Sequence, residues 1–292
     1  MDAVSDVDDV HAIEAIRAAC LAHDGHDPLD EAAALALKNH GTAGTSVVVA
    51  DGGFALVRDG ELTLAVAPDA RRRGVGTRLL AAVGAADLAW SHGDHPGAAA
   101  LAASSGWQRV RDLWVMRRPT SAALPDVVVP DGVTLRGFEP GDEAQVLAVN
   151  AAAFAHHPEQ GGLDAAGLAE RMAEPWWDPA GLILAVDTSA DPSGTAGEVL
   201  AFHWTKQHDA GLGEVYVVAV GPGAQGRGLG RVVTLAGLHH LAGLGVAEVL
   251  LYVESDNTPA VRLYSSLGFA HAAADTHVQY RAKSAATGAA AE

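Results

Sequence analysis

A short glycine-rich turn occurs twice in the sequence, and this repeat limits the possible folds more than any other feature. The first copy, residues 71–76, reads RRRGVG, and the second copy, residues 225–230, reads QGRGLG. Each follows a short apolar stretch with a proline before the turn, and each leads into an expected helix. Gly74 and Gly228 are 154 positions apart. Because this spacing is the length of a domain, the chain is predicted to contain two similar domains.

A second shared motif follows each turn. Residues 95–107 match residues 257–269 at a distance of 162 positions, so the second copy carries a short insertion between its two motifs. Between the copies, three prolines and the absence of a helical period are typical of a linker. The predicted organisation is an N-terminal domain over residues 1–118, a linker over 119–132, a C-terminal domain over 133–281 and a frayed tail over 282–292.

Each copy shows the same coarse order of elements. A strand and helices come first, then several strands, the glycine turn, a helix, another strand and a second helix that ends at a Gly-aromatic pair. Residues 46–50 and 54–58 are expected to form a hairpin, with residues 182–186 and 199–204 as its counterpart. The predicted class is α/β, with a mixed central sheet flanked by helices in each copy.

Charge and cysteine content exclude several kinds of function. The formal net charge of −17 argues against nucleic-acid or anionic-membrane partners, because phosphate binding needs a basic surface. Cys20 is the only cysteine, so no internal disulfide can form and a reducing cytosol is favoured. The acidic N-terminus lacks a signal-peptide pattern, and no apolar run of about 18 residues occurs. We therefore expect a cytoplasmic monomer with no nucleic-acid or membrane partner.

Both glycine turns are predicted to bind an anion. A strand that ends in such a turn and leads into a helix presents unpaired backbone N–H groups, with the positive end of the helix dipole behind them. Glycine lets the backbone approach a pyrophosphate, and Arg72, Arg73 and Arg227 add positive charge. In so glycine-rich a chain, a turn of this pattern is expected by chance about 0.3 times. Two such turns, each between a strand and a helix, are not expected by chance. A Rossmann dinucleotide site is a weaker alternative, because no acidic residue closes a following strand at the expected place.

The two turns resemble the Arg/Gln-x-x-Gly-x-Gly/Ala motif of the GNAT acetyltransferase superfamily, and the resemblance covers nearly the whole chain. It implies acetyl-CoA as cosubstrate. Transfer of an acetyl group to an amine needs an acceptor without its proton, a stabilised oxyanion and an acid for the departing thiolate. Strand periodicity predicts that Glu214, Tyr216, Val218 and Val220 share one face, which places Glu214 as the base. Tyr264 is then the acid, the role of the matching tyrosine in many GNAT enzymes.

Each of these two residues also has a purely structural interpretation. A Glu at the start of a strand is usually solvated, and a Tyr on an amphipathic helix is more often part of the core. Their position next to both glycine-turn motifs favours the functional interpretation. The N-terminal copy has Gly60 and Ala102 at the aligned positions, so it is predicted to bind acetyl-CoA without catalysing.

Four phrases of the second half, at residues 157–162, 202–206, 213–220 and 251–257, resemble the mycothiol synthase family. That family acetylates the cysteinyl amine of a cysteine–glucosamine–inositol conjugate. The resemblance implies an acceptor site formed by Glu31, Glu159, Lys206, Glu214 and Tyr252. The acetyl-CoA residues that it implies are Leu64, Ala65, Val66, Arg72, Arg73, Gly74, Val75, Gly76 and Thr77 in the first copy, and Val218, Ala219, Val220, Gln225, Gly226, Arg227, Gly228, Leu229, Gly230, Arg231, Asn257, Thr258, Pro259, Ala260, Val261 and Arg262 in the second.

Two other functions remain open from the sequence. The first is acetylation of a different amine, on a protein N-terminus, an aminoglycoside or a polyamine, since one fold can host many acceptors. The second is a non-catalytic acyl-CoA-binding sensor, which would keep the turns and lose the base and the acid. No metal is expected, because adjacent histidines such as His156 and His157 point apart.

Overall fold

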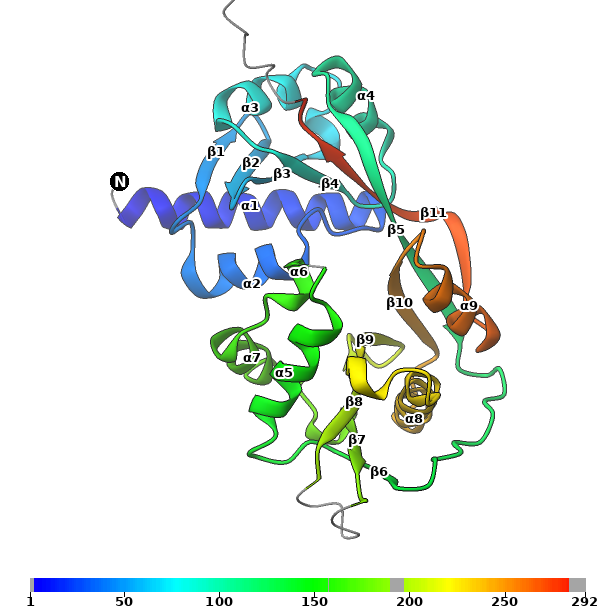
Figure 1. The fold of residues 1–292 in the computed structure, drawn as a ribbon. Coiled ribbons are helices and arrows are strands. Elements are labelled where there is room, and N and C mark those ends of the chain that lie inside the picture. Colours follow the sequence, from blue (N-terminus) through cyan, green and yellow to red (C-terminus); the bar gives the residue numbers. More distant parts are fainter. Residues whose placement is uncertain (1–2, 157, 190–196, 284–292) are drawn as a thin grey trace, which may run out of the picture. The chain divides into compact units, whose positions relative to one another are not determined.

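The computed structural model describes residues 3–156, 158–189 and 197–283. They form two compact units. Figure 1 labels the elements of both units and colours the chain from blue at the N-terminus to red at the C-terminus. The first unit contains the residues up to Trp114 and those from Ala272 onward, and the second is Val115–His271. These units are not identical with the two repeat copies, because the last strand of the second copy counts with the first unit. The predicted α/β class, with a mixed central sheet flanked by helices, is confirmed.

The first unit has helices on both faces of its sheet. Its helices are α1 (Ala3–Asp24), α2 (Glu31–His40), α3 (Val75–Val83) and α4 (Pro96–Ser104), and its strands are β1 (Ser46–Ala50), β2 (Gly53–Arg58), β3 (Glu61–Val66) and β4 (Leu88–Ser91), with a short 3-10 helix η1 (Pro68–Ala70). Alternation along β2 explains the layers: Phe54 packs in the core with α1 and α2, whereas Ala55 packs against α3. The predicted hairpin of β1 and β2 is confirmed.

The second unit has the same layered plan. Its helices are α5 (Glu143–Ala153), α6 (Pro158–Gly161), α7 (Ala165–Met172), α8 (Leu229–Gly243) and α9 (Thr258–Ser266), its strands are β6 (Val133–Arg136), β7 (Leu182–Asp187), β8 (Val199–Gln207), β9 (Leu212–Val220) and β10 (Glu248–Glu254), and its 3-10 helices are η2 (Pro179–Gly181) and η3 (Pro222–Ala224). Trp204 packs on the side of α5 and α7, and Ala201 packs on the side of α8. The predicted hairpin of β7 and β8 is confirmed.

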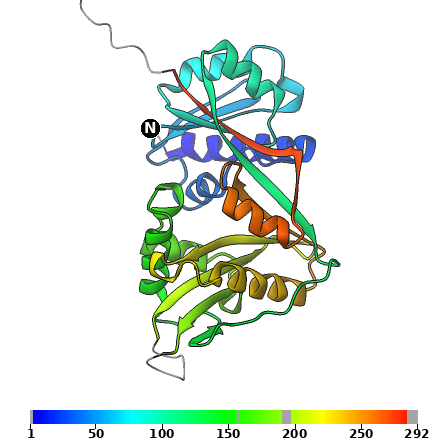
Figure 2. The same cartoon turned by 45° about the vertical axis from the view of Figure 1, so that its right-hand side comes forward.

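Two long strands, β5 (Gln108–Pro119) and β11 (Ala270–Arg281), are exchanged between the copies. β5 follows α4 in the first copy but lies beside β10 of the second, where the Arg117 guanidinium is 2.8 Å from the Glu248 carboxylate. β11 follows α9 in the second copy but pairs antiparallel with β4 of the first, with Val278 opposite Ser91. Figure 2 shows β11 in red where it joins the first unit. The last strand of each copy therefore completes the sheet of the other.

In both copies the strand before the glycine turn separates from its parallel neighbour. β3 and β4 are paired only at their first residues, up to Leu62 opposite Ala89. β9 and β10 are paired up to Val215 opposite Leu251, and both strands continue beyond this pair. Backbone N–H and C=O groups past these points are therefore not used by the parallel ladder. In the described ranges, no helix combines the length and apolar character that crossing a bilayer requires.

Candidate active site

The two glycine turns have the same backbone geometry. Gly74 and Gly228, with φ of 76° and 77°, occupy the N-cap positions of α3 and α8, and neither helix start has a side-chain cap. A Cβ added at Gly228 would meet nothing within 4 Å, so the left-handed φ rather than crowding requires glycine there. The uncapped N–H groups and the helix dipole suit both turns to a phosphate. Gly226 is also left-handed, and in the first copy Arg72 adopts this conformation with φ of 63°.

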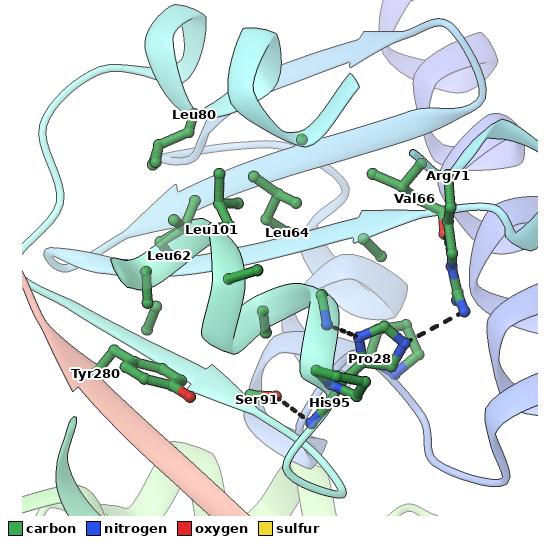
Figure 3. Close-up of a pocket in the computed structure, with 18 of the residues that line it drawn as sticks. Pro28, Leu62, Leu64, Val66, Arg71, Leu80, Ser91, His95, Leu101 and Tyr280 are labelled. Atoms are coloured by element: carbon green, nitrogen blue, oxygen red, sulfur yellow. Dashed lines mark hydrogen bonds between the residues drawn. The ribbon is translucent and has the colours of Figure 1, made fainter. Parts of the chain in front are cut away.

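A cavity of about 560 Å³ lies at the first turn, in the first unit (Figure 3). Its walls are β3 on one side, β4 and α4 on the other, and the start of α3 at the turn. The predicted acetyl-CoA residues that line it are Leu64, Ala65, Val66, Arg72, Gly74, Val75, Gly76 and Thr77, whereas Arg73 does not line it. Figure 3 shows Leu62, Leu80 and Tyr280 toward one end and Arg71 with His95 at the other. The cavity is thus apolar at one end and polar at the end near the turn.

The polar end holds an ion pair that the sequence did not indicate. Asp24 of α1 lies 2.5 Å from Arg71, and the Arg71 Nε also donates to the Val66 carbonyl at 2.9 Å. The hydrogen bond from Arg71 lowers the pKa of Asp24 to about 2. Burial, and then the charge of Arg71, lower the pKa of His95, which caps α4 by accepting from the Gly97 N–H. Asp24 was missed because α1 lies far from both motifs and has no distinctive pattern.

Strand β9 of the second copy contains a β-bulge that overturns the predicted side-chain alternation. Thr205 lies opposite Val215 and Trp204 opposite Val217, so Tyr216 is the extra residue. Tyr216 packs on the α5 and α7 side, but Val218 packs on the α8 side. The prediction that Glu214, Tyr216, Val218 and Val220 share one face is therefore wrong, because the bulge reverses the alternation after Tyr216. The β2–β3 ladder of the first copy has no such shift.

Glu214 is a buried carboxylate rather than a solvated strand end. It lies on β9 with Lys206 of β8 on one side and Leu250 of β10 on the other, just before the point where β9 and β10 separate. Its side chain is 6% exposed, and its Oε2 is 2.6 Å from Nε2 of His208. A carboxylate buried this far is stable only with a partner, and such groups concentrate at functional sites.

Aromatic rings surround the Lys206 ammonium beside Glu214. The Nζ of Lys206 lies 4.9 Å from the ring centre of Trp176 and 5.3 Å from that of Tyr216. The Tyr216 hydroxyl accepts a 2.8 Å hydrogen bond from the Arg171 Nε. These cation–π contacts hold a positive charge in a polar and aromatic setting. Trp176 and Arg171 come from outside the phrases used in the sequence analysis and were missed for that reason.

Helix α9 begins with the cap that the sequence motif indicates. The Asn257 side chain accepts from the Ala260 N–H at 3.2 Å, in parallel with His95 at the start of α4. Tyr264 is half-buried on this helix, with its ring centre 6.0 Å from that of Phe269. Burial raises the pKa of Tyr264 to about 12. Its hydroxyl therefore keeps its proton at neutral pH, as an acid must.

The predicted acceptor residues belong to both units. Glu31 is the first residue of α2 and belongs to the first unit, whereas Lys206, Glu214 and Tyr252 belong to the second. Tyr252 is 43% exposed on β10. The Glu159 side chain lies outside the described part of the structure. Over the described ranges, no three His, Cys, Asp or Glu side chains are grouped so as to hold a metal ion.

Comparison with known proteins agrees with this geometry. Residues 155–269 match the acetyltransferase (GNAT) family model. A solved tandem GNAT protein from the clavulanic acid biosynthesis pathway is similar with a TM-score of 0.67 and 20% identity, over 96% of each chain. The fold is therefore like that of a tandem GNAT protein.

Closer relatives identify the family within this class. A mycothiol acetyltransferase of Nocardioides sp. is 58% identical over 92% of this chain and 96% of its own length. A mycothiol acetyltransferase of Nocardia farcinica is 48% identical over 94% of each chain. The chain belongs to the mycothiol acetyltransferase family.

Proposed function

We propose that this protein transfers the acetyl group of acetyl-CoA to the cysteinyl amine of a cysteine–glucosamine–inositol conjugate, which yields mycothiol. Family membership supports the acceptor. The observation that carries the chemistry is the buried Glu214 carboxylate, which lies where β9 parts from β10 and upstream of the second glycine turn.

The second copy has the features that acetyl-CoA binding requires. Coenzyme A brings the acetyl group as a thioester, and its pyrophosphate is the anion for which the uncapped start of α8 is suited. We assign this role to the turn from Gln225 to Arg231, the strand edge of Val218, Ala219 and Val220, and the first turn of α9 from Asn257 to Arg262. The β9–β10 separation leaves the backbone groups past Val215 outside the parallel ladder and able to bind the pantetheine arm.

Glu214 is the proposed base and Tyr264 the proposed acid. A carboxylate on β9 can remove the proton of an acceptor ammonium directly or through one water. Tyr264, whose burial raises its pKa to about 12, has a proton to give to a departing thiolate. Lys206 lies opposite Glu214, and its contacts with Trp176 and Tyr216 support our assignment of Lys206 to the acceptor. We assign Glu31, Glu159 and Tyr252 to the acceptor as well, on the resemblance alone.

The first copy is proposed to bind acetyl-CoA without catalysing. Its cavity and left-handed Gly74 suit the ligand. By sequence spacing Gly60 aligns with Glu214, but the extra residue in β9 shifts the register, so Glu61, opposite Leu88, holds the strand position of Glu214, opposite Leu250. The proposal therefore depends on the missing acid. Ala102 replaces Tyr264 and has no proton to donate. The regular β2–β3 ladder also lacks the bulge that reshapes β9.

The division into residues 1–118, a linker over 119–132, and residues 133–281 remains our proposal for the two repeat copies, with 282–292 as a tail. Residues 284–292 of this tail lie outside the described part of the chain. We also expect a monomer in the cytosol, where a single cysteine would stay reduced.

An acceptor comparison tests the proposed reaction. The purified chain is assayed for acetyl-CoA turnover with the cysteine–glucosamine–inositol conjugate, a peptide amine, an aminoglycoside and a polyamine. We expect kcat/KM to be highest for the conjugate. A higher kcat/KM for another amine would show that the proposed acceptor is wrong and that the proposed reaction class is right. Acetyl-CoA binding without turnover of any of these amines would indicate a sensor.

A further inference from the structure

The Glu214 carboxylate has a histidine partner that the reaction outlined above does not use. The Nε2 of His208 lies 2.6 Å from Oε2 of Glu214, and the two side chains are six residues apart on either side of the β8–β9 turn. Glu214 is 6% exposed and His208 31% exposed. The imidazole therefore stands between the buried carboxylate and the solvent.

The turn that carries His208 is held in place by its own backbone. The His208 N–H donates to the Leu212 carbonyl at 2.9 Å and closes the hairpin. Within the turn, one carboxylate oxygen of Asp209 accepts from the Gly211 and Leu212 N–H groups at 2.7 and 2.9 Å. On the other side of His208, Gln207 pairs with Gly213. Because these contacts fix the chain on both sides of His208, the hairpin sets the direction of its side chain toward Glu214.

We propose that His208 is a positioning residue for Glu214, an inference that rests on the proposed role of Glu214 as base. The Nε2–H donates to Oε2, which selects one carboxylate orientation and leaves Oε1 for the acceptor amine. A base held in one orientation by a second hydrogen bond does not need to be ordered when the acceptor arrives. No other hydrogen bond to Glu214 is found in the described ranges, so His208 is the group that orients it.

Several charged groups face this pair. Lys206 lies opposite Glu214 on β8, Asp209 is in the same turn, and Tyr216 with its partner Arg171 lies on the α7 side. From β10, Glu248 lies opposite Leu212 and is paired with Arg117. Among these groups, the hydrogen bond to the Glu214 carboxylate comes from His208.

Three variants test the inference in the full chain. H208A removes the donor, H208Q keeps an N–H donor at a similar reach but cannot become charged, and H239A is the control. His239 is a surface imidazole of the same unit whose Nε2 lies 2.9 Å from the Pro125 carbonyl, away from the proposed site. For each variant, kcat and KM are measured between pH 5.5 and 9 with the cysteine–glucosamine–inositol conjugate, and thermal unfolding checks the fold.

We expect H208A to lower kcat about tenfold near neutral pH, with the KM for acetyl-CoA unchanged. H208Q should recover most of kcat because its amide restores the N–H donor, and H239A should match the wild type. In an E214Q background, H208A should cause no further loss.

A wild-type kcat in H208A would overturn the inference. So would an H208Q variant as slow as H208A, because a packing contact of the imidazole ring would not be rescued by a new N–H donor. If E214Q itself turns over like the wild type, the proposed role of Glu214 fails. If E214Q is slow while H208A is not, only the role of His208 fails.

Discussion

The internal repeat allows the same substitution to be made at two equivalent turns with different expected results. Gly74 and Gly228 have φ of 76° and 77° and hold the N-cap positions of α3 and α8. A Cβ at Gly228 meets nothing within 4 Å, and one at Gly74 meets only the flexible end of Arg78 at 3.3 Å. Substitution at either site therefore acts through backbone strain rather than through a clash.

The size of the effect follows from that strain. A left-handed conformation costs a residue with a Cβ about 1–2 kcal/mol, and a β-branched residue is a true outlier there. Against a total stability of about 5–15 kcal/mol, G74V and G228V should remain folded. If the turn relaxes to relieve the strain, its N–H groups lose their common direction. The same 1–2 kcal/mol then appears as a loss of phosphate affinity of about 5–30-fold.

The assay is titration calorimetry with acetyl-CoA, combined with steady-state turnover. We expect two acetyl-CoA per wild-type chain and one tight site in G74V, with kcat nearly unchanged. G228V should instead keep the first site and raise the KM for acetyl-CoA by about 5–30-fold. A single site in the wild type would show that the first copy does not bind acetyl-CoA, and a loss of turnover in G74V as large as that in E214Q would show that it takes part in the chemistry.

Three further outcomes follow from the site. E214Q should lower kcat by about 10²-fold or more near neutral pH, the usual scale for proton transfer, with an unchanged melting temperature; wild-type rates would remove Glu214 from the mechanism. Y264F should slow turnover, while calorimetry should still show acetyl-CoA binding; a variant that fails to bind or to fold would make Tyr264 a packing residue. Because burial raises the Tyr264 pKa to about 12, the wild-type rate should not fall through loss of the Tyr264 proton below about pH 11. D24N should lower the free energy of unfolding by about 2 kcal/mol at most at pH 7, because Arg71 depresses the Asp24 pKa from 3.8 to about 2. This contribution is present above pH 3.8 and disappears as the pH falls through about 2, so urea unfolding of D24N and wild type should converge near pH 2; an equal difference at pH 7 and pH 2 would contradict the linkage.

The sequence by itself determined the features that depend on local backbone chemistry. Glycine is required where φ is left-handed before a helix. The sequence therefore predicted both turns, at Gly74 and Gly228, and the start of the helix that follows each turn. The α/β class and both hairpins followed from strand alternation and turn residues. The cap at Asn257 was likewise marked by its own motif.

Only the tertiary structure decided the features that depend on pairing between distant segments. The bulge at Tyr216 exists in the register of β9 against β8, which a single strand does not encode, and it moved Val218 to the face opposite Tyr216. The exchange of β5 and β11 and the contact of Asp24 with Arg71 join residues far apart in the chain. The burial of Glu214 against His208 has the same origin, because a carboxylate at the start of a strand is solvated or enclosed according to what its neighbours place around it.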